Sequence, residues 1–314
     1  MKQEKPISII IDTDTGVDDA VAIIMAVASP VTINAITTVA GNTNVEQVTQ
    51  NVGQLLSALK QDIPVYQGAV SPLFGTPPEL GGLMGEDGLG NASSSLPAPG
   101  RPPEPEHAAI ALTRLVRQPS VNTTLIALGP LTNIALALKI DPDFVQNIPR
   151  LLVMGGAVDA KGNATPAAEF NTCCDPESAA VVLQAGFKEI VIVPWEASTR
   201  YMILWDDIET MSSLGTPNSH LFAKLNHHTS QNLKEAFKLP GIPFPDPLAM
   251  AVALDPSICT HAISAPVMVE TNGAIGRGLM AVDWYQTTGQ PANAEVVLEV
   301  DFEAYKRTLI DSLK

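Results

Sequence analysis

The sequence predicts a single α/β domain with a mostly parallel central sheet flanked by helices. Short apolar runs rich in β-branched residues alternate with helix-like stretches, a pattern typical of β-α-β units. The 314 residues are enough to bury one large core, and neither a linker nor an internal repeat divides them. The length and the 46% of hydrophobic residues exclude a disordered chain and a small disulfide-stapled scaffold.

The chain up to residue 193 carries the clearest alternation. Its apolar runs are nearly continuous, as is typical of parallel strands that are buried on both faces. The stretches between them repeat apolar residues at helical spacing. We therefore expect strands at residues 7–11, 33–39, 123–128, 150–154 and 189–193, and helices at residues 18–28, 45–59, 104–116, 131–138 and 176–185.

Beyond residue 200 the pattern is less regular. The helical spacing of apolar residues predicts two further helices, and short β-branched runs predict three further strands. The expected helices are at residues 217–237 and 247–254, and the expected strands are at residues 265–270, 280–284 and 295–300.

One segment, residues 71–105, interrupts the alternation and is called here the Pro/Gly-rich segment. It holds eight prolines and seven glycines among 35 residues, so 15 positions resist regular structure. A loop of this length inside a compact α/β domain is usually either a functional cover or a disordered excursion. The run from Met84 to Gly90 is too specific to be filler, so we expect a cover near the active site.

The charge of the chain limits its partners. Eighteen Lys and Arg residues against 33 Asp and Glu residues give a formal net charge of −15 at pH 7. Such a surface repels phosphate backbones and anionic membranes, which disfavours a nucleic-acid polymer and a membrane as partners. The longest purely apolar run, residues 20–28, is far shorter than the roughly 20 residues of a membrane helix. Three cysteines without CxxC spacing favour a reducing cytoplasm.

Four carboxylates follow the first expected strand within eight residues: Asp12, Asp14, Asp18 and Asp19. The strand ends at Asp12, the chain turns through Gly16, and a helix begins near Asp18. The four acids therefore gather at the carboxyl edge of the sheet, where open α/β folds bind their ligands. Helix capping explains one or two of them. It does not explain Asp12 and Asp14, because an unpaired charge at the end of an apolar strand is costly.

The carboxylate cluster predicts a divalent-cation site. All the candidate ligands are hard oxygen atoms, and no His or Cys lies near them in the sequence. This donor set favours Ca²⁺ or Mg²⁺ over zinc and copper.

The run DTDTGVDDA at residues 12–20 resembles the opening signature of the inosine-uridine-preferring nucleoside hydrolases. Further motifs of that family follow in order over nearly the whole chain, which makes the resemblance highly specific. They are TTVAGN at 37–42, GPLTNIA at 129–135, VMGG at 153–156, GNAT at 162–165, AEFN at 168–171 and DPLA at 246–249. The resemblance implies the nucleoside-hydrolase form of the α/β fold.

The resemblance also implies one Ca²⁺ and assigns its ligands. They are the carboxylates of Asp14, Asp19 and Asp246 and the backbone carbonyl of Leu128. Taken alone, Asp246 before a proline and an apolar helix would be interpreted as a helix cap. In the company of the other motifs we interpret it as a metal ligand.

The same resemblance assigns the residues that hold the ribose. Several convergent acceptors and amides suit a polyhydroxylated ring, and such a site rejects analogues that lack a hydroxyl by about 10⁴ to 10⁵. Asparagines after strands are otherwise common turn residues. The matching positions are Asp18, Asn42, Met154, Asn163, Glu169 and Asn171.

The implied reaction is hydrolysis of the N-glycosidic bond of a ribonucleoside, as in purine and pyrimidine salvage, giving a free nucleobase and ribose. A Ca²⁺-bound water, deprotonated by Asp14, would attack C1′. The transition state is expected to resemble an oxocarbenium ion, which nearby carboxylates would stabilise. Asp12 is expected to orient the metal ligands from behind, and no organic cofactor is needed.

The nucleobase side departs from the family pattern. Pyrimidine-tolerant members have a His before the last calcium-binding Asp and another before Gly-Glu, where this chain has Pro245 and Met84. Neither residue donates a proton, which leaves Met84 as an apolar contact to the base. His227 or His228 is an alternative base contact, against a solvated helix face. Since adjacent helical positions face about 100° apart, at most one of them points inward.

Other interpretations of the base side stay open. Trp195, Trp205 or Trp284 could stack on the base, although each is more often a core residue. The chain could hydrolyse a modified or cationic ribosyl compound, whose base leaves without a proton, or be a catalytically silent ribose or nucleoside binder. The resemblance implies a homodimer or homotetramer and leaves the nucleobase preference open.

Overall fold

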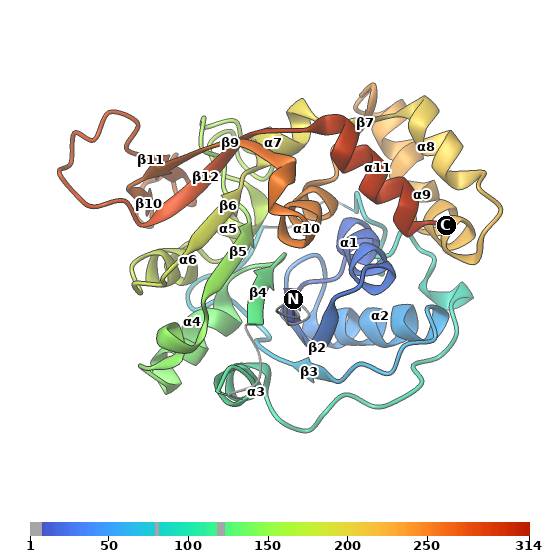
Figure 1. Ribbon diagram of the computed structural model, residues 1–314, viewed down its shortest axis with the longest axis horizontal. Coiled ribbons are helices and arrows are strands. Elements are labelled where there is room, and N and C mark those ends of the chain that lie inside the picture. Colours follow the sequence, from blue (N-terminus) through green and yellow to red (C-terminus); the bar gives the residue numbers. More distant parts are fainter. Residues whose placement is uncertain (1–7, 79–81, 118–122) are drawn as a thin grey trace, which may run out of the picture.

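A computed structural model of the chain describes residues 8–78, 82–117 and 123–314. Its centre is an eight-stranded sheet with the strand order β3-β2-β1-β4-β5-β6-β12-β9 (Figure 1). Every neighbouring pair is parallel except β12 with β9. The predicted mostly parallel α/β fold is confirmed.

Up to β6 the strands of this sheet fall close to the expected ranges, except β3, which was not predicted and has only three residues. They are β1 (Ser8–Thr13), β2 (Thr32–Thr38), β3 (Val65–Gln67), β4 (Thr123–Ala127), β5 (Arg150–Met154), β6 (Ile190–Val193), β9 (Cys259–Ala265) and β12 (Ala294–Val300). Two small antiparallel pairs lie outside it, β7 (Ile203–Leu204) with β8 (Gly241–Ile242) and β10 (Val267–Val269) with β11 (Met280–Val282). The expected strand at 7–11 begins with Ile7, which lies outside the described residues.

The helices cover both faces of the sheet. They are α1 (Val17–Ala28), α2 (Val45–Ala58), α3 (Ala108–Leu115), α4 (Thr132–Ile140), α5 (Phe170–Cys174), α6 (Pro176–Leu183), α7 (Trp195–Arg200), α8 (Trp205–Ser212), α9 (Pro217–Glu235), α10 (Pro245–Leu254) and α11 (Phe302–Ser312). Three short 3-10 turns complete the described part of the chain, at Ser93–Ser95, Phe144–Asn147 and Pro256–Ile258.

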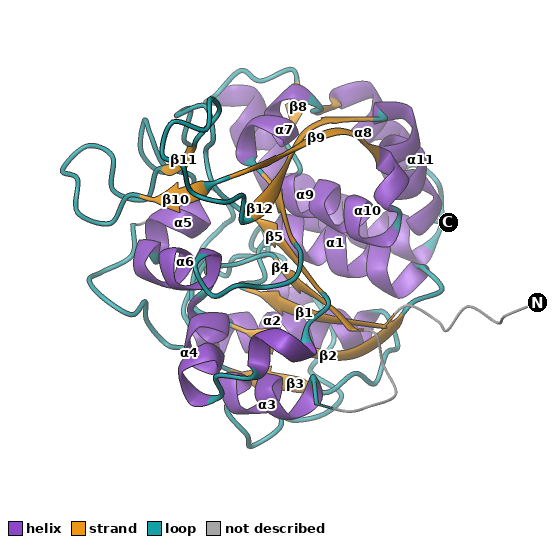
Figure 2. Cartoon of the chain, turned by 60° about the vertical axis from the view of Figure 1, so that its left-hand side comes forward, coloured by secondary structure: helices purple, strands orange, loops and turns teal. Residues whose placement is uncertain are grey.

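Two apolar cores lie on opposite faces of the sheet. Figure 2 shows α1, α9 and α10 on one side and α3, α4 and α6 on the other. The first core joins α1, α2, α9, α10 and α11 to one face of β1 and β2, and the second joins α3, α4 and α6 to the other face. Consecutive residues of β1 alternate between the two cores, because side chains of a strand point to opposite faces. This burial fixes the register of β1 and so the position of the acids that follow it.

Several elements differ from expectation for local physical reasons. The helix expected at 104–116 begins only at Ala108, because Glu104 is extended beside β3 and its N–H donates to the carbonyl of Val65 at 2.8 Å. His107 then caps α3 by accepting from the N–H of Ala109. The edge strand β9 and helix α11 were not predicted. β9 is largely accessible to solvent, so it lacks a buried strand's continuous apolar run.

The described part of the Pro/Gly-rich segment contains no helix or strand beyond the turn at Ser93–Ser95. Its residues 82–93 lie against α9 and α2, and Leu89 is fully buried in the first core. Across the described ranges, no helix combines the length and the apolarity that a membrane span requires.

Candidate active site

The acids predicted after the first strand gather at the carboxyl edge of the sheet. Asp14 follows β1 directly, and its Oδ2 accepts a hydrogen bond from the backbone N–H of Asn42 at 2.8 Å. The side chain fits between two glycines: a Cβ on Gly41 would lie 2.0 Å from Asp14 Oδ2, and one on Gly129 would lie 2.9 Å from Oδ1. The loops after β2 and β4 therefore need glycine to leave room for Asp14.

Asp19 is held by the turn between β1 and α1. Its Oδ1 accepts from the hydroxyl of Thr13, and its Oδ2 accepts from the backbone N–H of Gly16 at 2.9 Å. The second contact satisfies an orphan donor at the start of α1, so part of the capping interpretation holds for Asp19. The amide of Asn42 adds a donor at 3.3 Å from Asp19 Oδ2.

The structure brings Asp18, Asp19 and Asp246 together. Carboxylate oxygens of these three residues, one from each, lie within 4.8 Å of one another, a spacing at which they could hold one metal ion. Asp246 comes from the first turn of α10, where Phe244 is the N-cap and no side chain caps the helix. Asp246 therefore does not act as the helix cap that its sequence context suggested.

Burial and mutual repulsion dominate the electrostatics of the cluster. Burial raises the pKa of Asp14 and of Asp246 well above the usual value, and the charges of neighbouring aspartates raise both further. Burial, together with the charge of Asp19, raises the pKa of Asp18 to about 7. Oδ1 of Asp18 is buried without a hydrogen-bond partner.

The cluster has the chemistry of a cation site. Among the described residues that line the adjoining cavity there is no Lys, Arg or His to neutralise the carboxylates. Buried carboxylates of this kind are stable when a cation compensates them. The donors are all hard oxygens, which fits Ca²⁺ or Mg²⁺.

Asp12 lies behind this cluster and does not line the cavity. Its Oδ1 accepts from the hydroxyl of Thr37 and from the amide of Asn133, at 2.5 and 2.8 Å, while its Oδ2 is buried without a partner. Burial raises the pKa of Asp12 to about 7 in spite of those two hydrogen bonds. The amide of Asn133 also bonds the carbonyl of Thr38 and the N–H of Ala69, so Asp12 is linked to the loops after β2 and β3.

The ends of β4 and β5 supply a second group of polar atoms. Asn171 donates from its amide to the backbone carbonyl of Leu128 at 2.7 Å and to that of Met154 at 3.3 Å. The carbonyl of Leu128, the expected fourth metal ligand, is thus already bonded on one side. A carbonyl oxygen has two lone pairs, so one remains for another ligand.

Glu169 and Asn163 shape the loop that leads to α5. Glu169 is the N-cap of that helix, and its carboxylate accepts from the backbone N–H groups of Gly156, Asn171 and Thr172 at 2.9, 2.8 and 3.2 Å. Burial outweighs these bonds and raises the pKa of Glu169. Asn163 is exposed, and its Oδ1 accepts from the N–H of Phe170 at 2.8 Å.

These groups surround one cavity of about 450 Å³. Ten of the fourteen residues expected to form or support the site line it: Asp14, Asp18, Asn42, Met84, Leu128, Met154, Asn163, Glu169, Asn171 and Asp246. Asp12, Asp19, His227 and His228 do not. A carboxylate oxygen of Asp19 nevertheless lies within 4.8 Å of carboxylate oxygens of Asp18 and Asp246, which do line the cavity.

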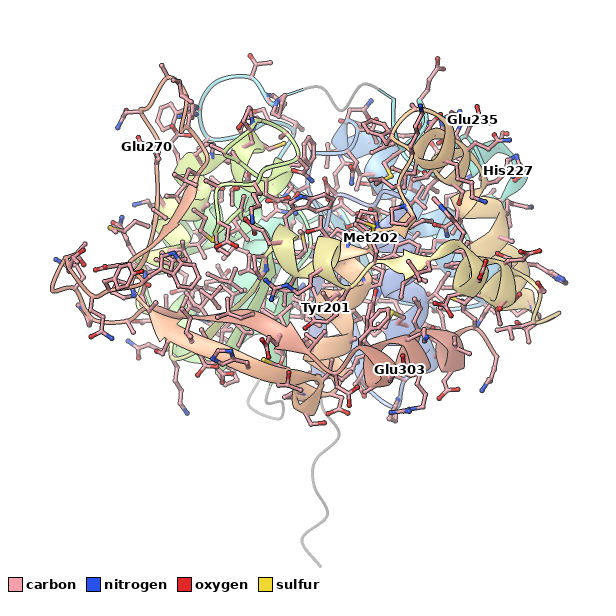
Figure 3. The ribbon with its side chains drawn as sticks, turned by 90° about the horizontal axis from the view of Figure 1, so that it is seen from above. Tyr201, Met202, His227, Glu235, Glu270 and Glu303 are labelled. Atoms are coloured by element: carbon pink, nitrogen blue, oxygen red, sulfur yellow. The ribbon has the colours of Figure 1, made fainter. Side chains whose placement is uncertain are left out.

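Neither histidine lies where a base contact requires. Figure 3 shows His227 at the periphery of the molecule, and its side chain is exposed. His228 is half-buried on α9, with its Nε2 3.0 Å from the amide of Asn232 and away from the cavity lining. Helix geometry gives the reason, because the cavity-facing position is Asn226, and the next two residues point about 100° and 200° away from it.

Sequence reasoning missed most of the wall opposite the acids. Four positions of α9 and the turn after it line the cavity at the spacing of one helix face: Asn226, Thr229, Leu233 and Phe237. Their exposure rises from 2% at Asn226 to 61% at Phe237, so the helix runs from the closed end of the cavity to its mouth. Oδ1 of Asn226 is buried without a partner. That spacing was present in the sequence, but the same buried face of α9 also carries core residues such as Phe222 and Leu225.

The three tryptophans lie in different surroundings. Trp195 lines the cavity, together with Met202, which Figure 3 labels near the middle of the molecule. Trp205 instead donates its indole N–H to the carbonyl of Leu239 and lies under the ammonium of Lys234. Trp284 is 41% exposed after β11. Only Trp195 remains a candidate for stacking on a base.

Known proteins resemble the chain over almost its whole length. The family model described as "Inosine-uridine preferring nucleoside hydrolase" matches residues 9–307. The pyrimidine-specific ribonucleoside hydrolase RihA of Salmonella gallinarum is 37% identical over 309 residues, which cover 98% of each chain.

Solved structures show the same similarity. An inosine-guanosine nucleoside hydrolase superposes with a TM-score of 0.90 at 34% identity and covers 98% of both chains. A purine-preferring ribonucleoside hydrolase from Gardnerella vaginalis superposes with a TM-score of 0.88 at 26% identity, also over 98% of both chains. The names of these relatives differ in the nucleobase they specify.

Proposed function

We propose that this chain, which belongs to the inosine-uridine preferring nucleoside hydrolase family, hydrolyses the N-glycosidic bond of ribonucleosides with the help of Ca²⁺ and Asp14. Membership of the family makes the chain an enzyme that acts on N-glycosyl bonds of ribonucleosides. The identity of the cation and the roles of the residues are our proposal. One observation carries it: buried carboxylates gather at the cavity, and no described residue of its lining is a basic side chain that could neutralise them.

The residues present fit a calcium ion. Asp18, Asp19 and Asp246 offer carboxylate oxygens, with Asp14 and the carbonyl of Leu128 beside them as the ligands that the family resemblance implies. Six to eight oxygen ligands in a flexible arrangement suit Ca²⁺ better than the strict octahedron of Mg²⁺. When bound, the ion supplies positive charge that makes nearby water easier to deprotonate.

Asp14 is the proposed general base. It lines the cavity, it is buried, and its carboxylate is fixed by the N–H of Asn42 and by the two glycines around it. A carboxylate held in this way can take a proton from water while that water attacks C1′ of the ribose. The remaining carboxylates favour positive charge on the sugar, which develops as the bond to the base lengthens.

The ribose is proposed to lie against the acids, with the base toward α9. Asp18, Asn42, Glu169 and Asn171 line the cavity near the cluster and provide acceptors and amides for hydroxyl groups. Met154 closes the cavity at the end of β5, where it gives the sugar ring an apolar floor. Asn163 lines the cavity from its exposed loop.

The base side favours a second candidate substrate class. The described residues of the cavity lining include no His, Lys, Arg or Tyr, and its Asp and Glu residues belong to the groups assigned above to the cation, the water and the ribose. Among these residues none is therefore left to protonate a leaving base. A cationic base, as in nicotinamide riboside, leaves as a neutral molecule and needs no acid. This observation keeps cationic ribosyl compounds beside ordinary ribonucleosides as substrates to test.

Release of reducing sugar from a panel of nucleosides tests the proposal. The panel contains uridine, cytidine, inosine, guanosine, adenosine and nicotinamide riboside, each with and without stringent chelation. We expect turnover of at least one member, its loss on chelation, and its return on addition of Ca²⁺. The matched controls are D14N, which removes the proposed base, and D62N, which changes an exposed aspartate far from the cavity.

Two outcomes would contradict the proposal. Turnover that survives stringent chelation would remove the cation from the reaction. Binding of ribose without turnover of any nucleoside would leave a silent binding protein. The cytoplasmic location and the homodimer or homotetramer stay predictions from sequence.

A further inference from the structure

We propose that Asn51 is a positioning residue that joins residues 14–19, called here the acidic turn, to the Pro/Gly-rich segment. One amide would then fix the backbone on both sides of the cavity. The inference rests on the proposed function, because it concerns the turn that carries Asp14. It assigns a role to a residue that neither lines the cavity nor belongs to any motif discussed above.

Asn51 lies in the middle of α2 and is completely buried. Its amide nitrogen donates to the backbone carbonyl of Thr15 at 3.2 Å and to the backbone carbonyl of Asp87 at 2.8 Å. Its amide oxygen accepts from the side-chain amide of Gln47 at 2.9 Å. The two carbonyls can only accept, so the orientation of the Asn51 amide is fixed by its partners.

The first of these bonds, to the carbonyl of Thr15, reaches the acidic turn. Thr15 stands between Asp14 and Gly16, whose N–H holds the carboxylate of Asp19. The hydroxyl of Thr15 also bonds that of Thr13 at 2.9 Å, and Thr13 in turn donates to Asp19. A displacement of the Thr15 carbonyl therefore moves the backbone from which both acids extend.

The second bond, to the carbonyl of Asp87, reaches a hydrogen-bonded turn of the Pro/Gly-rich segment. The carboxylate of Asp87 accepts from the backbone N–H groups of Leu89, Asn91 and Ser93 at 2.8 to 2.9 Å, which closes the turn on itself. The N–H of Gly90 donates to the carbonyl of Met84 at 2.7 Å. Met84 lines the cavity, so a displacement of the Asp87 turn moves part of the cavity wall.

The two turns lie close together around Asn51. Gly88 has a positive φ of 76°, and a Cβ added to it would lie 3.4 Å from the amide nitrogen of Asn51 and 3.6 Å from the carbonyl of Thr15. The Pro/Gly-rich segment thus packs directly onto Asn51 and the acidic turn. Buried carbonyls that lose a donor in such a place force the backbone to shift, because an unpaired buried polar group is costly.

Gln54 provides a matched control. It lies one turn along α2, is also buried, and donates from its amide to the carbonyl of Ser93 at 3.0 Å. It therefore holds the Pro/Gly-rich segment, as Asn51 does, but none of the hydrogen bonds of its side chain reaches the acidic turn. Both variants therefore remove a donor from the Pro/Gly-rich segment, and only N51L also removes one from the acidic turn.

The test compares N51L, Q54L and the wild type by calcium affinity of the metal-free protein and by kcat and KM. For N51L we expect calcium binding about tenfold weaker, kcat lower by about tenfold or more, and a raised KM. For Q54L we expect a KM raised a few fold, with kcat and calcium affinity within about twofold of the wild type. Leucine keeps the branched shape of asparagine with methyl groups in place of the amide, is one atom shorter than glutamine, and removes the donor in both variants.

A milder variant covers the case in which N51L does not fold. Q47L removes only the donor that holds the Asn51 amide oxygen, from a half-buried position on α2. We expect it to weaken calcium binding and lower kcat in the same direction, by about two- to fivefold.

The outcomes separate this inference from the proposed function. If N51L or Q47L lowers the melting temperature while calcium affinity, kcat and KM stay at wild-type values, Asn51 is only structural and the inference is wrong. If the wild type hydrolyses no nucleoside, the proposed function fails, and the calcium affinities of N51L, Q47L and Q54L still decide the role of Asn51.

Discussion

The two sides of the cavity are built from opposite materials. The acidic side consists of carboxylates directly after β1 and in the first turns of α1 and α10. Backbone N–H groups fix Asp14 and Asp19, and glycines leave room for Asp14. The apolar side consists of α9, the turn after it and the Pro/Gly-rich segment, where Leu83, Met84, Leu233 and Phe237 line the cavity. The acidic side is destabilising without a cation, whereas the apolar side contributes to the core.

This difference predicts that substitutions on the acidic side and on the apolar side change different properties of the protein. Removing an acid should lower activity and relieve repulsion, while removing an apolar residue should lower stability and weaken binding of the base. Active sites commonly contain residues that support activity and lower the stability of the fold.

The largest expected effect is at Asp14. We expect D14N to lower kcat by about 10³ or more, because an amide cannot accept the proton of water. KM should stay within a few fold. The measurement is steady-state release of reducing sugar from the best substrate of the panel. A D14N enzyme with kcat within tenfold of the wild type would rule out Asp14 as the base.

The D246N variant should show most clearly that an acid of the cluster supports calcium binding and lowers stability. The raised pKa of Asp246 means that the folded metal-free protein keeps a proton that the unfolded chain releases above about pH 4, so stability is lost as the pH rises. The D246N variant has no carboxyl group at this position, so it does not lose this stability as the pH rises. At pH 7 in chelator we expect it to be more stable than the wild type by about 1 kcal/mol in urea unfolding, while calcium binds at least about tenfold more weakly. Equal calcium affinity would show that Asp246 is not a ligand.

Leu233 tests the apolar side. The side chain is buried on α9 and lines the cavity. We expect L233A to lose about 2 to 3 kcal/mol of unfolding free energy and to raise KM several fold, with kcat within about threefold. Unfolding in urea and steady-state kinetics measure the two effects. A large fall in kcat with unchanged stability would erase the contrast between the two sides.

The smallest effect is expected at Asp87. Burial raises its pKa, but hydrogen bonds from the side chain and N–H of Ser93 and from the N–H groups of Leu89 and Asn91 outweigh burial and lower it overall. A carboxyl with a lowered folded pKa adds stability above its unfolded pKa of about 4, and that stability disappears as the pH falls through the folded value. We expect D87N to be less stable by up to about 1 kcal/mol at pH 7 and equal to the wild type near pH 3. A difference that persists at pH 3 would contradict this account.

The acidic side was largely predictable from sequence. Asp12, Asp14, Asp18 and Asp19 stand in one short motif after a strand whose burial fixes its register, so their place at the sheet edge follows from local geometry. Asp246 is 227 positions beyond Asp19, and only the family resemblance connected the two.

The apolar side was not predictable from the same signals. The buried residues of α9 lie on one face, which carries core residues such as Phe222 and Leu225 as well as cavity residues. The spacing of Asn226, Thr229 and Leu233 therefore shows that they are buried, but not that they line a cavity. His227 and His228 are titratable and were the predicted base contacts, but neither lines the cavity. The short helices α5 and α7 carry cavity residues but span only one or two turns, too few for a periodic pattern to appear.

Calcium binding to the metal-free protein tests the central claim most directly. Isothermal titration of the chelator-treated wild type with Ca²⁺ should show one site per chain, and D246N in the same experiment should bind at least about tenfold more weakly. Saturating Ca²⁺ should also raise the melting temperature of the wild type, because the ion binds only the folded state. Absence of binding, or binding that D246N leaves unchanged, would contradict the assignment of the buried carboxylates to a cation.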